Sequence, residues 1–372
     1  MPPEPLGVTL AGPLRAERWV SIERYAQAIV ALSGDGLDIR LADVPPVSRP
    51  GAVAACAARY RVAPSLVAQS LVGDIVHVAD QALGHFIDAI TGVPSVVTCH
   101  DLMPLQLEGH YRGRFEAWFD GTLLRRSIAG MLRATRIIAV SENTRRDLES
   151  VLGVDREHVS VVPNIVAAGY RPEPDSEAWL TARGVFLPDA ARVLSVGHTR
   201  PYKNLELLIM AMADPSLADA HLVRCGAPLT GEQRELAVRL GVDGRVVELG
   251  HQEPEALTRI YNACHALAQP SRYEGFGVPV MEAMACGLPV VCSTGGALPE
   301  VAGGAALTVE LGGGGAPAAA AFAEGLARVL SDHAEARALR TRGLARAESF
   351  RPEAVRPRLL AAYRAAIEEF AA

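Results

Sequence analysis

Short apolar runs alternate with longer amphipathic stretches along almost the whole chain of 372 residues. This alternation predicts parallel β-sheets covered by helices on both faces, because parallel strands must be joined by crossover connections. The same alternation of strands and helices is expected in both halves of the chain, which a proline-rich, weakly periodic stretch at 163–188 separates. The expected strands are 6–10, 37–41, 75–78, 95–98, 136–140 and 159–162, then 193–196, 222–225, 246–249, 266–268, 290–292 and 306–309.

Helical patterns and their boundaries divide the chain further. We expect helices at 21–33, 114–134, 142–152, 317–331 and 333–348. Ser141 is a suitable N-cap for the third of these. We place one domain at 1–172 and a second at 173–350, and we expect an amphipathic helix at 351–372 that crosses back to the first domain.

Composition excludes several classes of protein. A net charge of −6, with no basic arm, argues against a general nucleic-acid binder. The six cysteines form no Cys-x-x-Cys pair, so we expect buried, reduced thiols rather than a zinc site. The first residues lack the pattern of a signal peptide, and no apolar run is long enough to span a membrane. The expectation is a cytoplasmic protein.

The stretch 271–291 is the most informative part of the chain for function. It places Glu274 and Glu282 on either side of a glycine-rich turn, between the strand expected at 266–268 and a helical pattern. A strand that leads through such a turn into a helix presents free N–H groups that suit phosphate. The two acids are therefore expected to grip different parts of one extended, phosphate-bearing ligand.

Lys203 points to the same kind of ligand. It is the only lysine in the chain, and it stands where an expected strand passes into a helical pattern beginning at Asn204. A compact ammonium at a strand–helix turn suits a phosphate group as a point charge. The alternative for Lys203 is a solvated surface side chain.

Taken together, these motifs resemble glycosyltransferase family 4. The resemblance rests on Glu274 and Glu282 eight residues apart, Gly275-Phe-Gly277 between them and Lys203-Asn204 upstream. The segments 161–164, 245–250 and 286–290 also look like the family, so the similarity spans nearly the whole chain. It implies an α/β protein of two Rossmann-like domains facing across a cleft, the B-type glycosyltransferase fold, and a retaining mechanism.

The resemblance also implies roles for the second domain. Glu274 looks like the acid that contacts the donor sugar at the reacting centre, and Glu282 like the one that holds the ribose hydroxyls. Lys203 and Arg200 resemble the basic pair that neutralises the leaving diphosphate, although the family often has arginine directly before the lysine and this chain has Tyr202 there. The remaining residues expected to bind the donor are Gly275, Phe276, Gly277, Val278 and Val246 in this domain, and Gly12 in the first domain.

In the first domain, His100 follows an expected strand and resembles the family's histidine near the sugar. The alternative is a histidine that caps a loop. Asp101, His77 and Asp80 also lie at strand ends, and we expect them to shape the acceptor side. Helix 114–134 mixes aromatic and basic residues, which fits either a core-facing stripe with a solvated basic face or docking on a lipid surface.

These features predict a metal-independent hexosyltransferase without a cofactor. The sequence offers no Asp-x-Asp pair beside the diphosphate, so basic residues would replace a metal ion. The segment 100–104 looks most like mannosyltransferases, which favours GDP-mannose as donor. We expect the acceptor to be a hydroxyl on a glycan, a lipid-linked sugar or a small molecule. A sugar-nucleotide epimerase on the same fold and a catalytically silent nucleotide-sugar-binding module are the alternatives.

Overall fold

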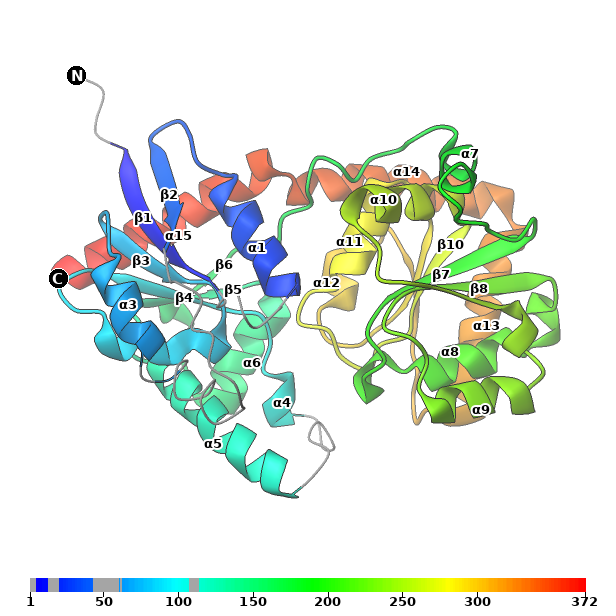
Figure 1. The fold of residues 1–372 in the computed structure, drawn as a ribbon, viewed down its shortest axis with the longest axis horizontal. Helices are drawn as coiled ribbons and strands as arrows, with labels where there is room; N and C mark the ends of the chain where they lie inside the picture. The colour runs from blue at the N-terminus through cyan, green and yellow to red at the C-terminus, as the bar shows by residue number, and fades with distance from the viewer. Residues whose placement is uncertain (1–4, 13–19, 43–59, 61, 107–113) are drawn as a thin grey trace. The chain divides into compact units, whose positions relative to one another are not determined.

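The computed structural model describes residues 5–12, 20–42, 60, 62–106 and 114–372 (Figure 1). The chain forms two compact units. Unit 1 comprises Met1–Ile165 together with Pro352–Ala372, and unit 2 comprises Val166–Arg351. Each unit is built around its own six-stranded parallel sheet, as the alternating sequence pattern predicts.

The sheet of unit 1 has the order β2-β1-β3-β4-β5-β6. Its central strands β3 and β4 are buried on both faces because helical connections cover the sheet, which is why they appear in the sequence as continuous apolar runs. All six lie within two residues of the predicted positions. They are β1 Leu6–Ala11, β2 Leu37–Leu41, β3 Ile75–Val78, β4 Ser95–Cys99, β5 Arg136–Ala139 and β6 Val159–Val161.

The sheet of unit 2 has the order β12-β11-β10-β7-β8-β9. Chain order reverses between the neighbours β10 and β7, which makes their carboxyl ends a topological switch point, the usual ligand site of open α/β sheets. These six strands were also predicted within two residues. They are β7 Ala191–Gly197, β8 Ala220–Gly226, β9 Val246–Gly250, β10 Ala266–Gln269, β11 Val290–Ser293 and β12 Leu307–Val309.

The predicted helices are present, and several shorter ones were not placed from the sequence. Ser141 caps α6 as expected, since its Oγ accepts from Thr144 N–H at 3.0 Å. The stretch 163–188 contains a helix, α7. The helices are α1 Val20–Val30, α3 Ala63–Gln69, α4 Met103–Gln106, α5 Arg114–Met131, α6 Glu142–Leu152, α7 Ser176–Thr181, α8 Leu205–Met212, α9 Gly231–Arg239, α10 Pro254–Ala263, α11 Val278–Ala285, α12 Leu298–Ala302, α13 Gly315–Ser331, α14 His333–Ala347 and α15 Pro352–Ala371.

Five of the six cysteines are buried and unpaired, as expected for reduced thiols; Cys56 lies outside the described residues. On α5, Leu124 packs against a core cluster of unit 1, while Arg125 and Arg126 are exposed. This arrangement matches the core-facing interpretation of that helix. The side chains of residues 114–120 lie outside the described part.

The last helix, α15, belongs to the core of unit 1. Val355, Leu359 and Tyr363 are fully buried and pack in one cluster with residues of β1, β2, β3 and α1. The Tyr363 hydroxyl hydrogen-bonds to Nδ1 of His77 at 2.8 Å, and His77 Nε2 bonds to the Thr98 hydroxyl at 2.7 Å. The final residues of the chain thus complete a buried polar network inside the first sheet.

Removing the Tyr363 hydroxyl tests this network. Tyr363→Phe keeps the ring but leaves Nδ1 of His77 buried without a partner, so we expect a loss of about 1–3 kcal/mol in unfolding free energy. Urea unfolding followed by circular dichroism measures it. Phe370→Ala, on the same helix and 50% exposed, is the control and should change stability by no more than about 0.5 kcal/mol. An equal change in unfolding free energy in the two variants would show that the Tyr363 hydroxyl does not stabilise this network.

Candidate active site

The loop between β10 and α11 forms the centre of the candidate site. It leads from Gln269 to Gly277, whose φ of 99° is a left-handed conformation that favours glycine. The backbone N–H groups of Phe276, Gly277 and Val278 have no acceptor among the residues that the structure describes. These three groups therefore offer donors to an anion at the start of an eight-residue helix.

Glu274 is held within this loop by three donors that converge on one carboxylate oxygen. Its Oε1 accepts from Lys203 Nζ, from Ser271 Oγ and from Gln269 Nε2, each at 2.6 Å. The side chains of Glu274 and Lys203 are only 11% and 12% exposed, so their ion pair is largely shielded from water. Oε2 has no hydrogen-bond partner among the described residues, which leaves it available to a ligand.

Lys203 comes from the loop after β7, the neighbour of β10 in the sheet. Two further bonds tie the loops together: Asn204 Nδ2 donates to Pro270 O at 3.1 Å, and Arg272 N–H donates to Tyr202 O at 2.7 Å. Asn204 adopts the left-handed conformation, with φ of 57°. The switch point of unit 2 thus brings a cation and an anion from loops about seventy residues apart into one rigid cluster.

A glycine pair supports the loop from behind, and the sequence analysis missed it. Gly295 and Gly296 follow β11 and lie so close to the loop that a Cβ on either would overlap the carbonyl oxygens of Ser271 or Glu274. Ala297 N–H donates to Glu274 O at 2.8 Å, which fixes the backbone of the acid. The sequence signal was a Gly-Gly pair directly after an apolar strand.

Glu282 lies in the second turn of α11, as expected from its spacing, and is 5% exposed. Its Oε2 accepts a hydrogen bond from the Tyr261 hydroxyl at 2.8 Å. Tyr261, on α10, is fully buried, and burial together with the nearby Glu282 raises its pKa well above the usual value. Tyr261 therefore stays protonated and orients the Glu282 carboxylate, a partner that the sequence analysis did not identify.

Arg200 and Val246 lie in different surroundings. Arg200 has an exposed side chain at the start of the short turn that contains Lys203. Val246 begins β9 and packs against the core of unit 2. Because all strands of a parallel sheet point the same way, Val246 lies at the edge opposite the carboxyl end that carries Lys203. The structure therefore does not bring Val246 together with the other predicted donor residues.

In unit 1, Gly12, Asp80, His100 and Asp101 lie at carboxyl ends of neighbouring strands. His100 Nε2 bonds to Ala79 O at 2.9 Å, and burial lowers the pKa of its ring. Asp80 and Asp101 accept from the backbone N–H groups of Ala82 and Met103, so both carboxylates order their own loops.

His77 differs from these residues because it lies inside the sheet. It is fully buried between Thr98 and Tyr363, and burial lowers its pKa to about 3, with His100 adding to the effect. The ring is neutral and inaccessible to an acceptor. The sequence-based expectation that His77 shapes the acceptor side is corrected: a strand of four residues buried on both faces leaves it no route to solvent.

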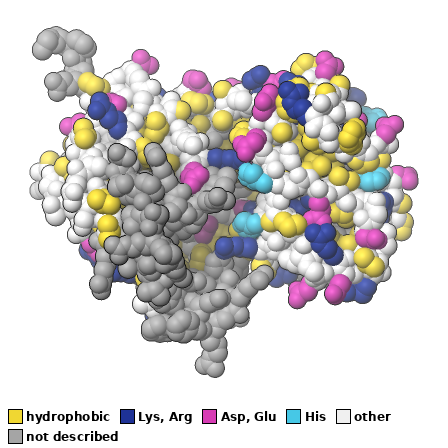
Figure 2. All heavy atoms as spheres, viewed as in Figure 1, with side chains coloured by type: hydrophobic (Ala, Val, Ile, Leu, Met, Phe, Trp, Pro, Cys, Tyr) yellow, Lys and Arg dark blue, Asp and Glu magenta, His cyan; other side chains and the backbone are white. Residues whose placement is uncertain are grey.

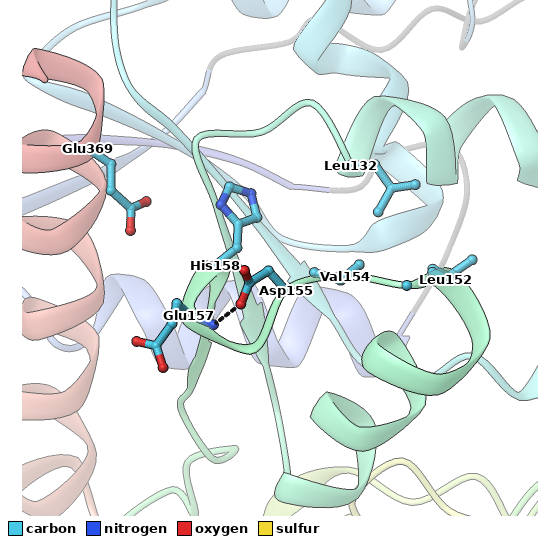
Figure 3. A pocket seen from close by; sticks show the side chains of 8 residues that line it. Leu132, Leu152, Val154, Asp155, Glu157, His158 and Glu369 are labelled. Atoms are coloured by element: carbon cyan, nitrogen blue, oxygen red, sulfur yellow. Dashed lines mark hydrogen bonds between the residues drawn. The ribbon is translucent and has the colours of Figure 1, made fainter.

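Two of the cavities formed by the described residues bear on the site. One, of about 310 Å³, is in unit 2 at the carboxyl ends of β8 and β9, the edge that also carries Lys203. It is lined by Arg224, Gly226, Ala227, Pro228, Arg234, Glu248 and Gly250. The other, of about 490 Å³, is in unit 1 (Figure 3). It lies near the amino ends of β5 and β6, away from His100, and Figure 3 shows acidic side chains and His158 around it.

Gly295→Ala tests whether the glycine pair positions Glu274. A methyl group there meets the backbone of 271–272, which cannot yield as a side chain can, so we expect a loss of about 1–3 kcal/mol in stability and weaker ligand binding. Thermal unfolding measures the first effect. Gly244→Ala is the control, because its Cβ would meet open space. Equal melting temperatures of the two variants would show that the close approach of Gly295 to residues 271–272 does not contribute to stability.

On the face shown in Figure 2, basic and acidic side chains of the described residues are interspersed, with no large area of a single sign. No helix in the described ranges is long and apolar enough to cross a membrane. No group of three or more His, Cys, Asp or Glu side chains in the described part of the chain could hold a metal ion.

The chain is similar to known proteins in both sequence and structure. It is 33% identical over 248 residues, 64% of this chain and 54% of the relative, to D-inositol 3-phosphate glycosyltransferase of Nocardia farcinica. It is 28% identical to O-antigen chain mannosyltransferase B of Escherichia coli, over 62% of this chain and 61% of the relative. The chain spans about half the length of the first of these relatives.

Solved structures with the same fold cover almost the whole chain. Sucrose-phosphate synthase from Thermosynechococcus elongatus matches with a TM-score of 0.75 and 21% identity, over 98% of this chain and 99% of that one. Anabaena HepE, in complex with UDP and glucose, matches with a TM-score of 0.73 and 18% identity, over 96% and 98%. These likenesses establish the B-type glycosyltransferase fold.

Two family models account for most of the sequence. The model for glycosyl transferases group 1 matches residues 183–346, which contain Lys203, Glu274 and Glu282. The model for glycosyltransferase family 4 matches residues 16–169, which contain His100. The chain therefore contains the two glycosyltransferase domains that these models describe, and it has the B-type fold.

Proposed function

We propose that this protein is a retaining, metal-independent glycosyltransferase that moves a hexose from a nucleotide-diphosphate sugar to an acceptor hydroxyl. The observation that carries the proposal is the buried pair of Lys203 and Glu274 next to the free N–H groups of Phe276, Gly277 and Val278. A cation, an acid and a helix N-terminus at one switch point provide what cleavage of a sugar–phosphate bond needs.

The leaving group is stabilised first. As the bond between sugar and diphosphate breaks, negative charge grows on the phosphate oxygens. Once the donor is bound, Lys203 and the N–H groups at the start of α11 face these oxygens, so they stabilise the growing charge without further reorganisation. Arg200, on the same loop as Lys203, adds a second positive charge. In this proposal the basic residues replace a metal ion.

Glu274 faces the reacting centre. Ser271 and Gln269 keep two hydrogen bonds on its Oε1 when the donor phosphate draws Lys203 away, so the carboxylate stays in place and remains solvated by protein groups. Its Oε2 is then available to contact the sugar as positive charge develops at the anomeric carbon. We propose front-face attack by the acceptor hydroxyl, with retention of configuration.

The nucleotide occupies the rest of the carboxyl edge of unit 2. Glu282, oriented by Tyr261, receives the ribose hydroxyls. The cavity near Gly226 and Gly250 accepts the base. Mannose on GDP is the proposed donor, in line with the mannosyltransferases among the relatives; solved neighbours were crystallised with UDP or UDP-glucose. His100 of unit 1 is proposed to contact the transferred sugar, and Asp101 and Asp80 to serve a hydroxyl acceptor on a glycan, a lipid-linked sugar or a small molecule.

A panel of nucleotide sugars tests the proposal without knowledge of the acceptor. If water takes the place of the acceptor, slow hydrolysis of the donor releases nucleoside diphosphate, and this release identifies the donor. We expect release from GDP-mannose above the other nucleotide sugars, and no change in excess chelator. Loss of activity in chelator with rescue by magnesium would refute metal independence, and binding without release would favour a silent module.

Lys203→Ala is expected to lower turnover by roughly 100-fold, the cost of one electrostatic contact in a dry site. Turnover is measured as release of nucleoside diphosphate at saturating donor. Arg337→Ala, which removes an exposed positive charge on α14, is the control and should be unchanged. Near-normal turnover of the Lys203 variant would remove this residue from the leaving-group site.

Substitutions of the two acids are expected to have different effects on nucleotide binding and on turnover. Glu282→Gln should chiefly weaken nucleotide binding, because the ribose is held equally in ground and transition states. Glu274→Gln should chiefly lower turnover, because its contact with the sugar matters as charge develops. Calorimetry with free nucleoside diphosphate distinguishes them. A larger loss of affinity in the Glu274 variant than in the Glu282 variant would reverse the two roles.

A further inference from the structure

His198 is a titratable side chain at the candidate site. It directly follows Gly197, the last residue of β7, and stands on the loop that carries Arg200 and Lys203. Its Nε2 hydrogen-bonds to the Tyr202 hydroxyl at 2.7 Å, with the two rings nearly perpendicular at 79°. Nδ1 has no partner among the described residues. One ring nitrogen is therefore fixed and the other is available.

Tyr202 links His198 to the ion pair. Its ring centroid lies 5.3 Å from that of His198 and 5.5 Å from Lys203 Nζ, so it contacts both. Its carbonyl oxygen accepts from Arg272 N–H in the loop that carries Glu274. The imidazole is consequently part of the same cluster as the groups proposed to bind the diphosphate.

Positive charge prevails around His198 when no ligand is present. Lys203, Arg200 and buried Arg224 all disfavour its protonation, and Glu274 is the opposing acid. Together with partial burial, which is the largest effect, these cations lower the pKa of His198 to about 4. The side chain also keeps access to water, so a proton can reach it. At neutral pH the imidazole is uncharged.

A diphosphate would reverse this balance. Two negative charges placed against Lys203 and Arg200 compensate the cations that disfavour protonation, and a nearby anion favours the charged form of a histidine. Either neutral tautomer can form the Tyr202 bond, but only the imidazolium donates from both nitrogens. It can therefore keep Tyr202 on Nε2 while it donates to a phosphate oxygen from Nδ1.

We propose that His198 is a third cationic contact for the donor diphosphate, and that it takes up a proton when the nucleotide sugar binds. The inference rests on the proposed function and adds a binding residue and a proton to it. The sign follows from linkage: a complex that holds more protons than its free partners loses affinity as pH rises. Donor affinity should therefore fall as pH rises from the range where free His198 titrates to the range where the bound imidazolium titrates. Above that second range the affinity should no longer change through this group.

The test is calorimetry of GDP-mannose and UDP-glucose binding at about pH 6, repeated in buffers of different ionisation enthalpy. The diphosphate of a nucleotide sugar is esterified at both ends and exchanges no proton near this pH, so the buffer dependence reports protons taken up by the protein. We expect uptake of roughly half a proton or more in the unaltered protein. His198→Gln, which can still bond to Tyr202, should bind more weakly and take up almost none.

His333→Gln is the matched control, because this histidine is exposed at the start of α14 and should leave proton uptake unchanged. Binding without uptake in the unaltered protein, or uptake that persists in His198→Gln, overturns the inference and leaves the proposed function standing. Failure of both nucleotide sugars to bind overturns the proposed donor, and the role of His198 with it.

Discussion

The ion pair between Lys203 and Glu274 is the interaction on which the site depends. Two charges that are nearly removed from water lose hydration, and their mutual attraction alone often fails to offset that loss. Here the carboxylate oxygen that faces Lys203 also accepts from Ser271 and Gln269, so the charge is compensated by hydrogen bonds as well. The Lys203 ammonium has no comparable set of further hydrogen bonds among the described residues. A ligand phosphate can therefore compete for the lysine without leaving the acid unsupported.

The sheet explains why such a pair forms between distant parts of the sequence. β10 lies between β7 and β11, so three successive loops meet at its carboxyl end. The first supplies Lys203, the second Glu274, and the third the glycines that pack behind the acid. Each loop is short and begins at a buried strand, so its position is set by the sheet rather than by its own flexibility. The topology thus converts separation in sequence into contact in space.

Many of the strands and several residues of the candidate site could be predicted from the sequence. Strands buried on both faces, such as β3 and β10, give continuous apolar runs, and every strand in the described residues was found from the sequence. The spacing of Glu274 and Glu282 placed one in a turn and the other in a helix. Tyr261 was missed because its role arises from a contact between two helices, α10 and α11. Val246 and His77 were misplaced because local sequence does not tell which end of a strand, or which depth, a residue occupies.

The packing of α15 has a consequence for how the protein is made. Unit 1 begins at the amino terminus, yet its core includes Tyr363 and the rest of the last helix, whereas unit 2 is contiguous and ends at Arg351. On the ribosome, where amino-terminal domains generally fold first, the first sheet therefore waits with part of its apolar surface uncovered until the final residues emerge. The second unit can complete its core earlier. The core of unit 1 thus depends on a helix that is synthesised after the whole of unit 2.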